Sequence, residues 1–450
     1  MWYKVFLKFP YELASKTLEL KENQQGMFRE VSEKDKVLFG ALVVFTIVAC
    51  FVAVRFFEMQ ASGNMFVNWC KRAVAEAGGL VSKAVFSHKK ELIATGPLLE
   101  KGEYVDSETL AGLLKARLGF LSPQIISVRN FLISRFSANF EFEDFSEPKL
   151  LALRQRYKLS DLIRSGITAL DKAVILRNWL REEINNGAPG PVDYNFNALD
   201  ILARAKNKET FSCSEYSTAF VQCALSMGYT ARYAGLFKGH VVAEIWNDEL
   251  AKWVVMDAYN NIHYERGGVP LGVLELHKIW ERKDFSDVKA VYGLKRDEFT
   301  ENTKEELLSF YHEFYVRMRN DWFLNRYPHW HIKGNSVMNA LEWQDRYTSN
   351  NILVAHETFN EEEINFPVNV VSVMVDEPGF SSKELRLILN TFTPNFSSFS
   401  INVDGVEQKK QVTPDFIWML HEGLNKIKIH AVNTLGIKGP ESSIEVYLSK

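Results

Sequence analysis

Only four cysteines occur in the 450-residue sequence: Cys50, Cys70, Cys213 and Cys223. So few cysteines exclude a disulfide-stabilised scaffold in a chain of this length. Cys213 and Cys223 would lie on one predicted helix, roughly 15 Å apart at a rise of about 1.5 Å per residue, which is beyond the reach of a disulfide. We therefore expect that these two cysteines do not pair with each other.

An excess of either charge is also absent, because 53 basic residues face 56 acidic ones and the formal net charge is −3. The composition therefore predicts no nucleic-acid partner, and other partners must be argued from local patterns. Hydrophobic residues make up 46% of the chain, which excludes a disordered protein and allows two or three domains, each with its own core.

Patterns typical of metal sites are lacking as well. No acidic calcium-binding loop is visible in the sequence. His329 and His331 form a His-x-His pair, but no cysteine or acidic ligand pattern lies near them. We therefore predict neither a metal nor a cofactor.

Charge is missing from one long hydrophobic run, residues 37–54, which has about the length needed to cross a bilayer. The alternative is a buried helix of a soluble protein. The flanking Lys34, Lys36 and Arg55 favour the membrane, because basic residues commonly border such spans. We predict one transmembrane helix at residues 37–57.

The segments on either side of this run suggest an orientation. Residues 1–36 lack the small-residue cleavage site of a signal peptide and are predicted to form a short cytoplasmic tail. Slightly more basic residues precede the span than follow it, so the body of the chain is predicted to be extracytoplasmic, in a periplasm or at a cell surface. Residues 58–160 have a helical pattern and carry no catalytic motif.

A capping-box pattern at Ser212 and Glu215 predicts a helix that begins at Cys213. At this position free N–H groups and the helix dipole favour a thiolate, so Cys213 is a candidate nucleophile. Cys223 lies on the apolar stripe of the same helix, and we interpret it as a small core residue. An earlier helix is predicted to follow Thr168, because an acidic residue stands three positions later.

Three short extended runs follow the cysteine helix, at residues 231–237, 240–246 and 251–257. A four-residue turn at 247–250 would place Trp246 opposite Ala251. The same register would place His240 opposite Asp257. The sequence therefore predicts an imidazole beside a carboxylate.

From about residue 165 to about residue 265, the chain resembles the catalytic core of the transglutaminase-like superfamily, a papain-like α+β fold with a Cys–His–Asp triad in this order. The resemblance rests on the helix at 172–184, Cys213 with its helix, the step from Gly228 into the first strand, Gly239-His240, and Trp253 with Asp257. The chain has Phe211 where many members have glycine, and Val242 where many have an aromatic residue.

This resemblance implies a role for each of three residues. Cys213 would be the nucleophile, His240 the general base and acid, and Asp257 the carboxylate that orients the histidine. The backbone N–H of Cys213 would be one donor of an oxyanion hole.

Aromatic and polar residues gather at 260–360, and we expect a helical extension packed on the catalytic core. The alternative is that these aromatic residues line a substrate groove. We assign residues 161–360 to a transglutaminase-like catalytic domain with an aromatic-rich extension.

Short alternating runs with turn pairs such as Asp404-Gly405 predict an immunoglobulin-like β-sandwich at 365–450. The predicted fold class is α+β.

Two functions are consistent with these features. The first is a membrane-anchored thiol enzyme that acts on amide bonds of protein or peptide substrates through a cysteine acyl-enzyme, by acyl transfer, deamidation or proteolysis. The second is a non-catalytic envelope scaffold or binding module on a papain-like core, in surface polysaccharide or cell-wall assembly, with the stretch from Trp322 to Trp343 as its binding surface. An ordered set of three potential triad residues favours the enzyme.

Overall fold

The computed structural model describes residues 96–98, 102–118, 122–133, 140–187, 197–294, 297–298, 301–323, 338–349, 354–376 and 383–449. All of these belong to one compact unit, Glu91–Lys450. The predicted cytoplasmic tail, the predicted transmembrane helix at 37–57 and the His329/His331 pair lie outside the described residues. Among the described helices, none combines the length and the hydropathy needed to cross a bilayer.

A mixed six-stranded sheet is the centre of the first region, which we call the α+β region (residues 140–370). Its strand order is β14-β13-β12-β5-β6-β7. Neighbours pair antiparallel, except for β13 and β14, which are parallel. The strands are β5 (Ala231–Leu236), β6 (Val241–Asn247), β7 (Lys252–Met256), β12 (Phe314–Arg317), β13 (Met338–Trp343) and β14 (Val354–Thr358).

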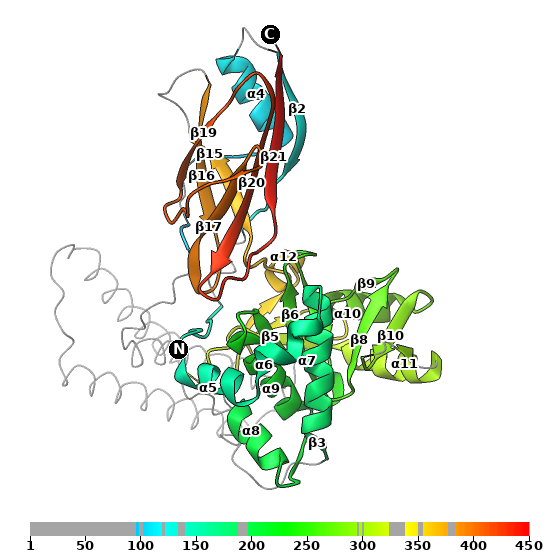
Figure 1. Cartoon of the computed structure of the whole chain (residues 1–450). Helices are drawn as coiled ribbons and strands as arrows, with labels where there is room; N and C mark the ends of the chain where they lie inside the picture. Colours follow the sequence, from blue (N-terminus) through cyan, green and yellow to red (C-terminus); the bar gives the residue numbers. More distant parts are fainter. Residues whose placement is uncertain are drawn as a thin grey trace, which may run out of the picture. The chain divides into compact units, whose positions relative to one another are not determined.

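Four helices share a hydrophobic core with one face of this sheet (Figure 1). They are α5 (Pro148–Arg156), α7 (Ala169–Glu183), α8 (Ala198–Ala205) and α9 (Cys213–Ser226). The predicted helix after Thr168 is confirmed as α7, because Thr168 Oγ1 accepts from Asp171 N and Asp171 Oδ2 accepts from Thr168 N, both at 3.0 Å. The predicted helix at Cys213 is confirmed as α9. Short turns α6 (Leu159–Leu162) and η2 (Ile163–Ser165) join α5 to α7.

The other face of the sheet has a second core, which includes residues of a smaller sheet of order β11-β10-β8-β9. Its elements are β8 (Ile262–Arg266), β9 (Val269–Pro270), α10 (Val273–Arg282), β10 (Val288–Tyr292), β11 (Asp297–Glu298), α11 (Glu301–Leu308), η4 (Ser309–His312) and α12 (Glu361–Ile364). The expectation of a helical extension over 260–360 is therefore wrong. The segment contains strand β12, which pairs with β5, some 80 residues earlier in the chain. A pattern within the segment could not predict this pairing with a distant strand.

The hairpin of β6 and β7 has a different register from the predicted one. Trp246 pairs with Trp253, and Asn247 pairs with Lys252 to close the turn. Asn247 Oδ1 accepts from the Leu250 N–H at 2.9 Å, and Ala251 takes a left-handed φ of 51°. This turn begins one residue later than expected, so the strand register moves by two residues.

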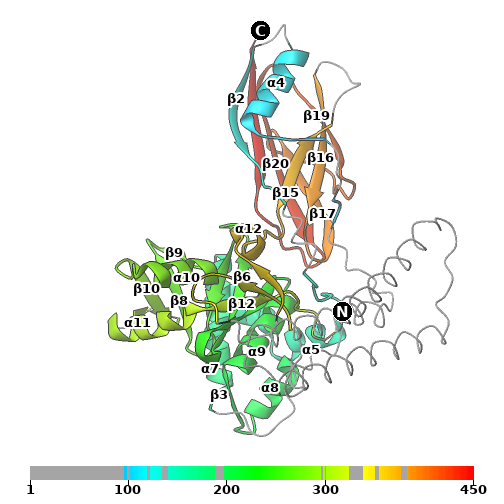
Figure 2. The same cartoon turned by 180° about the vertical axis from the view of Figure 1, so that it is seen from behind.

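Two antiparallel sheets form the second region, and both contribute to one hydrophobic core. The first sheet has the order β1-β15-β16-β19, three strands of which appear side by side in Figure 2. The second has the order β18-β17-β20-β21-β2. The strands are β1 (Glu103–Tyr104), β2 (Ser122–Arg129), β15 (Val371–Val375), β16 (Glu384–Thr391), β17 (Phe396–Val403), β18 (Val406–Glu407), β19 (Asp415–Met419), β20 (Gly423–Asn433) and β21 (Ser442–Ser449).

Part of this region comes from residues expected to be helical. Helix α4 (Ser107–Arg117) agrees with the helical pattern of residues 58–160, but β1 and β2 do not. Figure 1 shows β2 beside β21, and the two strands pair antiparallel from Ser122 opposite Ser449 to Arg129 opposite Ser443. Strand β2 forms by pairing with a strand more than 300 residues away, so its local sequence does not predict that it is extended.

Gly235 leaves room for a tyrosine in the middle of the sheet. A Cβ atom on this glycine would lie 2.2 Å from Cζ of Tyr315, its cross-strand partner. We expect Gly235→Ala to lower the free energy of unfolding by roughly 1–3 kcal/mol, because the buried ring would have to move. Urea unfolding measures this change.

The matched control is Gly112→Ala in α4, where nothing lies within 4 Å of the added Cβ. This helical substitution should leave stability unchanged or raise it by about 0.5–1 kcal/mol. Equal unfolding free energies for the two variants would show that the Tyr315 ring does not constrain β5.

Candidate active site

Cys213 is the first residue of α9, as the capping pattern predicted. Glu215 Oε2 accepts hydrogen bonds from Ser212 N at 3.0 Å and Ser212 Oγ at 2.6 Å, which fixes the start of the helix. One turn later, Ser217 Oγ donates to Val241 O at 3.1 Å. The first turns of α9 are therefore tied to the strand that begins immediately after His240.

A tight turn between β5 and β6 delivers His240. The turn η3 (Phe237–Gly239) contains left-handed φ angles at Lys238 (57°) and Gly239 (74°). Leu236 N donates to His240 O at 2.8 Å and closes the turn. The Cys213 thiol lies 3.8 Å from the Gly239 carbonyl oxygen, so the turn and the helix start are in contact.

Asp257 follows β7 and lies against the imidazole. Its Oδ2 is 2.8 Å from His240 Nε2, and both side chains are buried. Asn260 holds the same carboxylate, with its backbone N donating to Oδ1 at 3.0 Å and its Nδ2 donating to Oδ2 at 2.9 Å. The carboxylate is therefore fixed by three hydrogen bonds, and the imidazole supplies one of them.

His240 and Asp257 meet although the predicted register was wrong. His240 precedes β6, and Asp257 forms an isolated bridge with Ile262 beyond the end of β7. A shift of two residues leaves every side chain on its original face of the sheet, because the side-chain period of a strand is two. The pair therefore forms diagonally and not as a direct cross-strand pair.

The environment favours a protonated imidazole. Burial by itself favours the neutral ring, but the Asp257 charge, together with hydrogen bonds to Asp257 and Cys213, raises the pKa of His240 to about 10. Burial would also raise the pKa of Asp257, but the His240 charge and the hydrogen bonds from His240 and Asn260 hold that pKa below its usual value. Since Nε2 faces the carboxylate, Nδ1 is the nitrogen left to exchange a proton with the thiol.

Several residues that surround the pair were missed by the sequence analysis. The ring of Phe310, in η4, lies 4.9 Å from the His240 ring, and Tyr259 lies 6.1 Å from it. Asn260 could have been found, because an Asp followed by a polar residue three positions later is typical of a turn. Phe310 gave no such signal, since it is 70 residues away along the chain.

Cys223 is less accessible than Cys213, whose side chain is partly exposed. It is fully buried in the core of the α+β region, as predicted, and burial raises the pKa of its thiol well above the ordinary value. A buried thiol with a raised pKa is chemically inert.

Among the described residues, no cluster of three or more His, Cys, Asp and Glu side chains could hold a metal ion.

Comparison with known families identifies the segment that carries these three residues. Residues 158–258 match the transglutaminase-like superfamily. The match spans less than a quarter of the chain, contains Cys213, His240 and Asp257, and supports a papain-like fold for this segment. No curated protein matches the chain.

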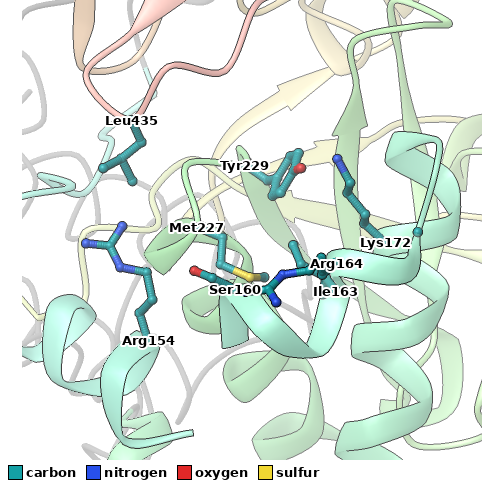
Figure 3. Close-up of a pocket in the computed structure, with 9 residues that line it drawn as sticks. Arg154, Ser160, Ile163, Arg164, Lys172, Met227, Tyr229 and Leu435 are labelled. Atoms are coloured by element: carbon teal, nitrogen blue, oxygen red, sulfur yellow. The ribbon is translucent and has the colours of Figure 1, made fainter. Parts of the chain in front are cut away.

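A cavity of about 370 Å³ lies near the C-terminal end of α9 and is lined by residues of the α+β region and by Leu435 of the second region. Figure 3 shows Arg154, Arg164 and Lys172 around it, together with Met227 and Tyr229. The three residues of the candidate site do not line this cavity. Its basic lining therefore tells us nothing about the chemistry at Cys213.

The pair of His240 and Asp257 should make the stability of the transglutaminase-like domain depend on pH. The raised pKa of His240 gives a stabilisation that is complete below pH 6.5 and is lost as the pH rises towards about 10. The lowered pKa of Asp257 gives a stabilisation that is present above pH 3.8 and is lost at lower pH. The pair should therefore stabilise the domain most between these two ordinary pKa values.

Urea unfolding of the wild type and of His240→Gln tests this expectation. The variant should be less stable by roughly 3 kcal/mol near pH 5.5, and the difference should shrink near pH 9.5. Asp257→Asn should show the same trend between these two pH values. A difference that stays constant with pH would contradict a charged pair.

Proposed function

We propose that this protein is a thiol enzyme that acts on amide bonds of protein or peptide substrates through an acyl-enzyme on Cys213. The observation that carries the proposal is the grouping of three side chains: a thiol at a helix N-terminus that lies 3.8 Å from the Gly239 carbonyl oxygen, the imidazole of the next residue, His240, and a buried carboxylate 2.8 Å from that imidazole. Nucleophilic catalysis at a cysteine needs this combination of nucleophile, base and orienting group.

The first half of the reaction follows from the positions of these groups. The His240 ring, whose surroundings favour the protonated form, takes the thiol proton first, and the Cys213 sulfur then attacks the amide carbonyl carbon as a thiolate. The carbon–nitrogen bond then breaks, and His240 returns the proton to the leaving ammonia or amine. Asp257 stays ionised throughout and stabilises the imidazolium. The backbone N–H of Cys213, at the positive end of the helix dipole, is one donor to the oxyanion.

The second half of the reaction regenerates the thiol. Water or an amine attacks the acyl carbon, His240 takes its proton, and the proton returns to the Cys213 sulfur as the carbon–sulfur bond breaks. With water the result is deamidation or proteolysis, and with an amine it is acyl transfer. The same three residues serve all of these outcomes, so the acceptor is selected by the groups around the site.

The location and the second region complete the proposal. The body of the chain would be extracytoplasmic behind a single membrane anchor at residues 37–57, supported by the uncharged run of this segment. The two antiparallel sheets of the second region, which share one core, support an immunoglobulin-like sandwich that carries the enzyme at the cell envelope.

The scaffold alternative has lost part of its basis. It used Trp322 as one end of a binding surface, but Trp322 is buried and packs edge-on against Tyr233, with 6.0 Å between ring centroids. No other described feature favours it over the enzyme.

Thiol labelling is the direct test of the enzyme. Iodoacetamide should label Cys213 roughly 100-fold faster than Cys223 near neutral pH, because a thiolate is the reacting species and Cys223 is buried in an apolar core. His240→Ala should slow the labelling of Cys213 by roughly tenfold, since the group that takes the thiol proton is gone. Peptide mapping by mass spectrometry measures each cysteine separately.

The control for this labelling is Cys223→Ala, which should leave the rate at Cys213 unchanged. Slow and equal labelling of both cysteines would rule out the enzyme and favour a binding module. Where labelling is fast, incubation with glutamine-containing peptides should add an acyl group to Cys213, and the mass of that group identifies the substrate.

A reporter fused after Lys450 tests the proposed location. A periplasmic or surface-dependent reporter should be active, because the predicted span would place the C-terminus outside the cytoplasm. Deletion of residues 1–57 should release the protein from the membrane fraction. Activity of a cytoplasm-specific reporter at the same position would reverse the proposed orientation.

A further inference from the structure

A cluster of half-buried aromatic rings lies next to the candidate active site. We call it the aromatic shelf and define it as Phe237, Trp280, His312 and Tyr347, which come from η3, α10, η4 and the loop after β13. The ring centroids of neighbouring members are 4.3–5.1 Å apart. None of the four is buried completely, so the cluster presents ring surface to solvent.

The aromatic shelf is continuous with the groups that surround the thiol. Phe237 belongs to the same three-residue turn as Gly239, whose carbonyl oxygen is 3.8 Å from Cys213 Sγ. His312 belongs to the same turn as Phe310, whose ring lies 4.9 Å from the His240 ring. A peptide with its amide bond at Cys213 would therefore extend onto the shelf within a few residues.

Three cationic side chains lie over rings of the shelf, and we call them the rim cations. Lys283 Nζ lies 3.6 Å from the Trp280 ring centroid, the Arg346 guanidinium 4.7 Å from that of Tyr347, and Lys238 Nζ 5.7 Å from that of Phe237. Attraction between a cation and an aromatic face holds such side chains in place. All three side chains are exposed to solvent.

Acidic residues near the shelf are already engaged by other groups. Glu281 forms an ion pair with Arg346 at 3.6 Å. Glu313 accepts from Ser349 N at 3.0 Å, and Asp345 lies 2.7 Å from His277 Nε2. Within the part of the chain that the structure describes, no carboxylate is paired with Lys238 or Lys283. Burial, with smaller effects of His277 and Lys283, holds the pKa of His312 below its usual value, although Glu313 and Asp345 oppose this effect.

We propose that the aromatic shelf and its rim cations bind an acidic segment of the peptide substrate, next to the amide bond that reacts at Cys213. This inference rests on the proposed function and names the substrate class for the same site. The charge pattern carries it, because two cations without an acidic partner lie beside the site in a chain whose net charge is −3. The rings add apolar contact area for the side chains that accompany the acidic residues.

Peptide binding to the full-length protein tests the proposal. The probes are two fluorescent peptides that share a central glutamine and differ only in flanking glutamate or lysine residues. The wild type should bind the glutamate peptide at least tenfold more tightly in low salt, and the preference should decrease as salt is added. The glutamate peptide should also protect Cys213 from iodoacetamide, because the bound segment lies beside it.

Variants of the rim cations locate the effect. Lys283→Gln should reduce the preference for the glutamate peptide several-fold, and Lys283→Glu should reverse it. Lys158→Gln is the matched control, since Lys158 is also an exposed lysine with a left-handed φ, 49° against 55° for Lys283. The control should bind both peptides as the wild type does.

The outcomes separate this inference from the proposed function. Fast labelling of Cys213 with equal affinity for the two peptides would overturn the acidic-substrate inference and leave the thiol enzyme intact. Slow labelling of Cys213 with a strong preference for the glutamate peptide would overturn the enzyme but keep an acidic-peptide site. Unchanged preference in both Lys283 variants would remove the shelf as the site.

Discussion

The packing of α9 is the constraint on which the candidate site depends. Every residue from 215 to 226 is buried, and the helix contacts α5, α7, α8, β5 and β6. A helix enclosed on all sides cannot slide or rotate without opening cavities around it. Its first residue, Cys213, is therefore held at a fixed position relative to β6, and so relative to His240.

A buried ion pair fixes the opposite face of the same strands. Glu244 Oε2 is 2.8 Å from Arg232 Nε across β5 and β6, and Glu244 Oε1 accepts from Val273 N at the start of α10. Arg232 also lies 4.1 Å from the Trp253 ring centroid and donates to Ile364 O. The desolvation cost of burying two charges offsets much of their attraction, so a buried pair of this kind adds little net stability. It connects the hairpin next to His240 with the helix that carries Trp280 of the aromatic shelf.

The site and the shelf thus share one support. The strands β5 and β6 carry α9 on one face and the Arg232–Glu244 pair on the other, and the turn that joins them contains Lys238 and Gly239 and leads to His240. Displacement of these strands would move His240, Lys238 and the contact of Gly239 with the thiol together. A two-residue change of the hairpin register leaves His240 and Asp257 in contact, since the strand faces are preserved.

The sequence by itself determined the features that depend on neighbouring residues. Capping pairs marked the starts of α7 and α9, the apolar stripe separated Cys223 from Cys213, and the order of Cys213, His240 and Asp257 identified the candidate site. The caps and the apolar stripe follow from interactions within four residues along the chain, which is the range of a helical turn. The order of the three candidate residues was recognised through the family resemblance.

Only the tertiary structure decided the features that depend on distant partners. The pairing of β2 with β21, the addition of β12 beside β5, and the contact of Phe310 with His240 join segments that are 70 or more residues apart. The turn after Asn247 set the hairpin register through a side-chain hydrogen bond that no periodicity reveals. Strand pairing and ring contacts of this kind are selected by the burial that the whole chain achieves, so their local sequences do not specify them.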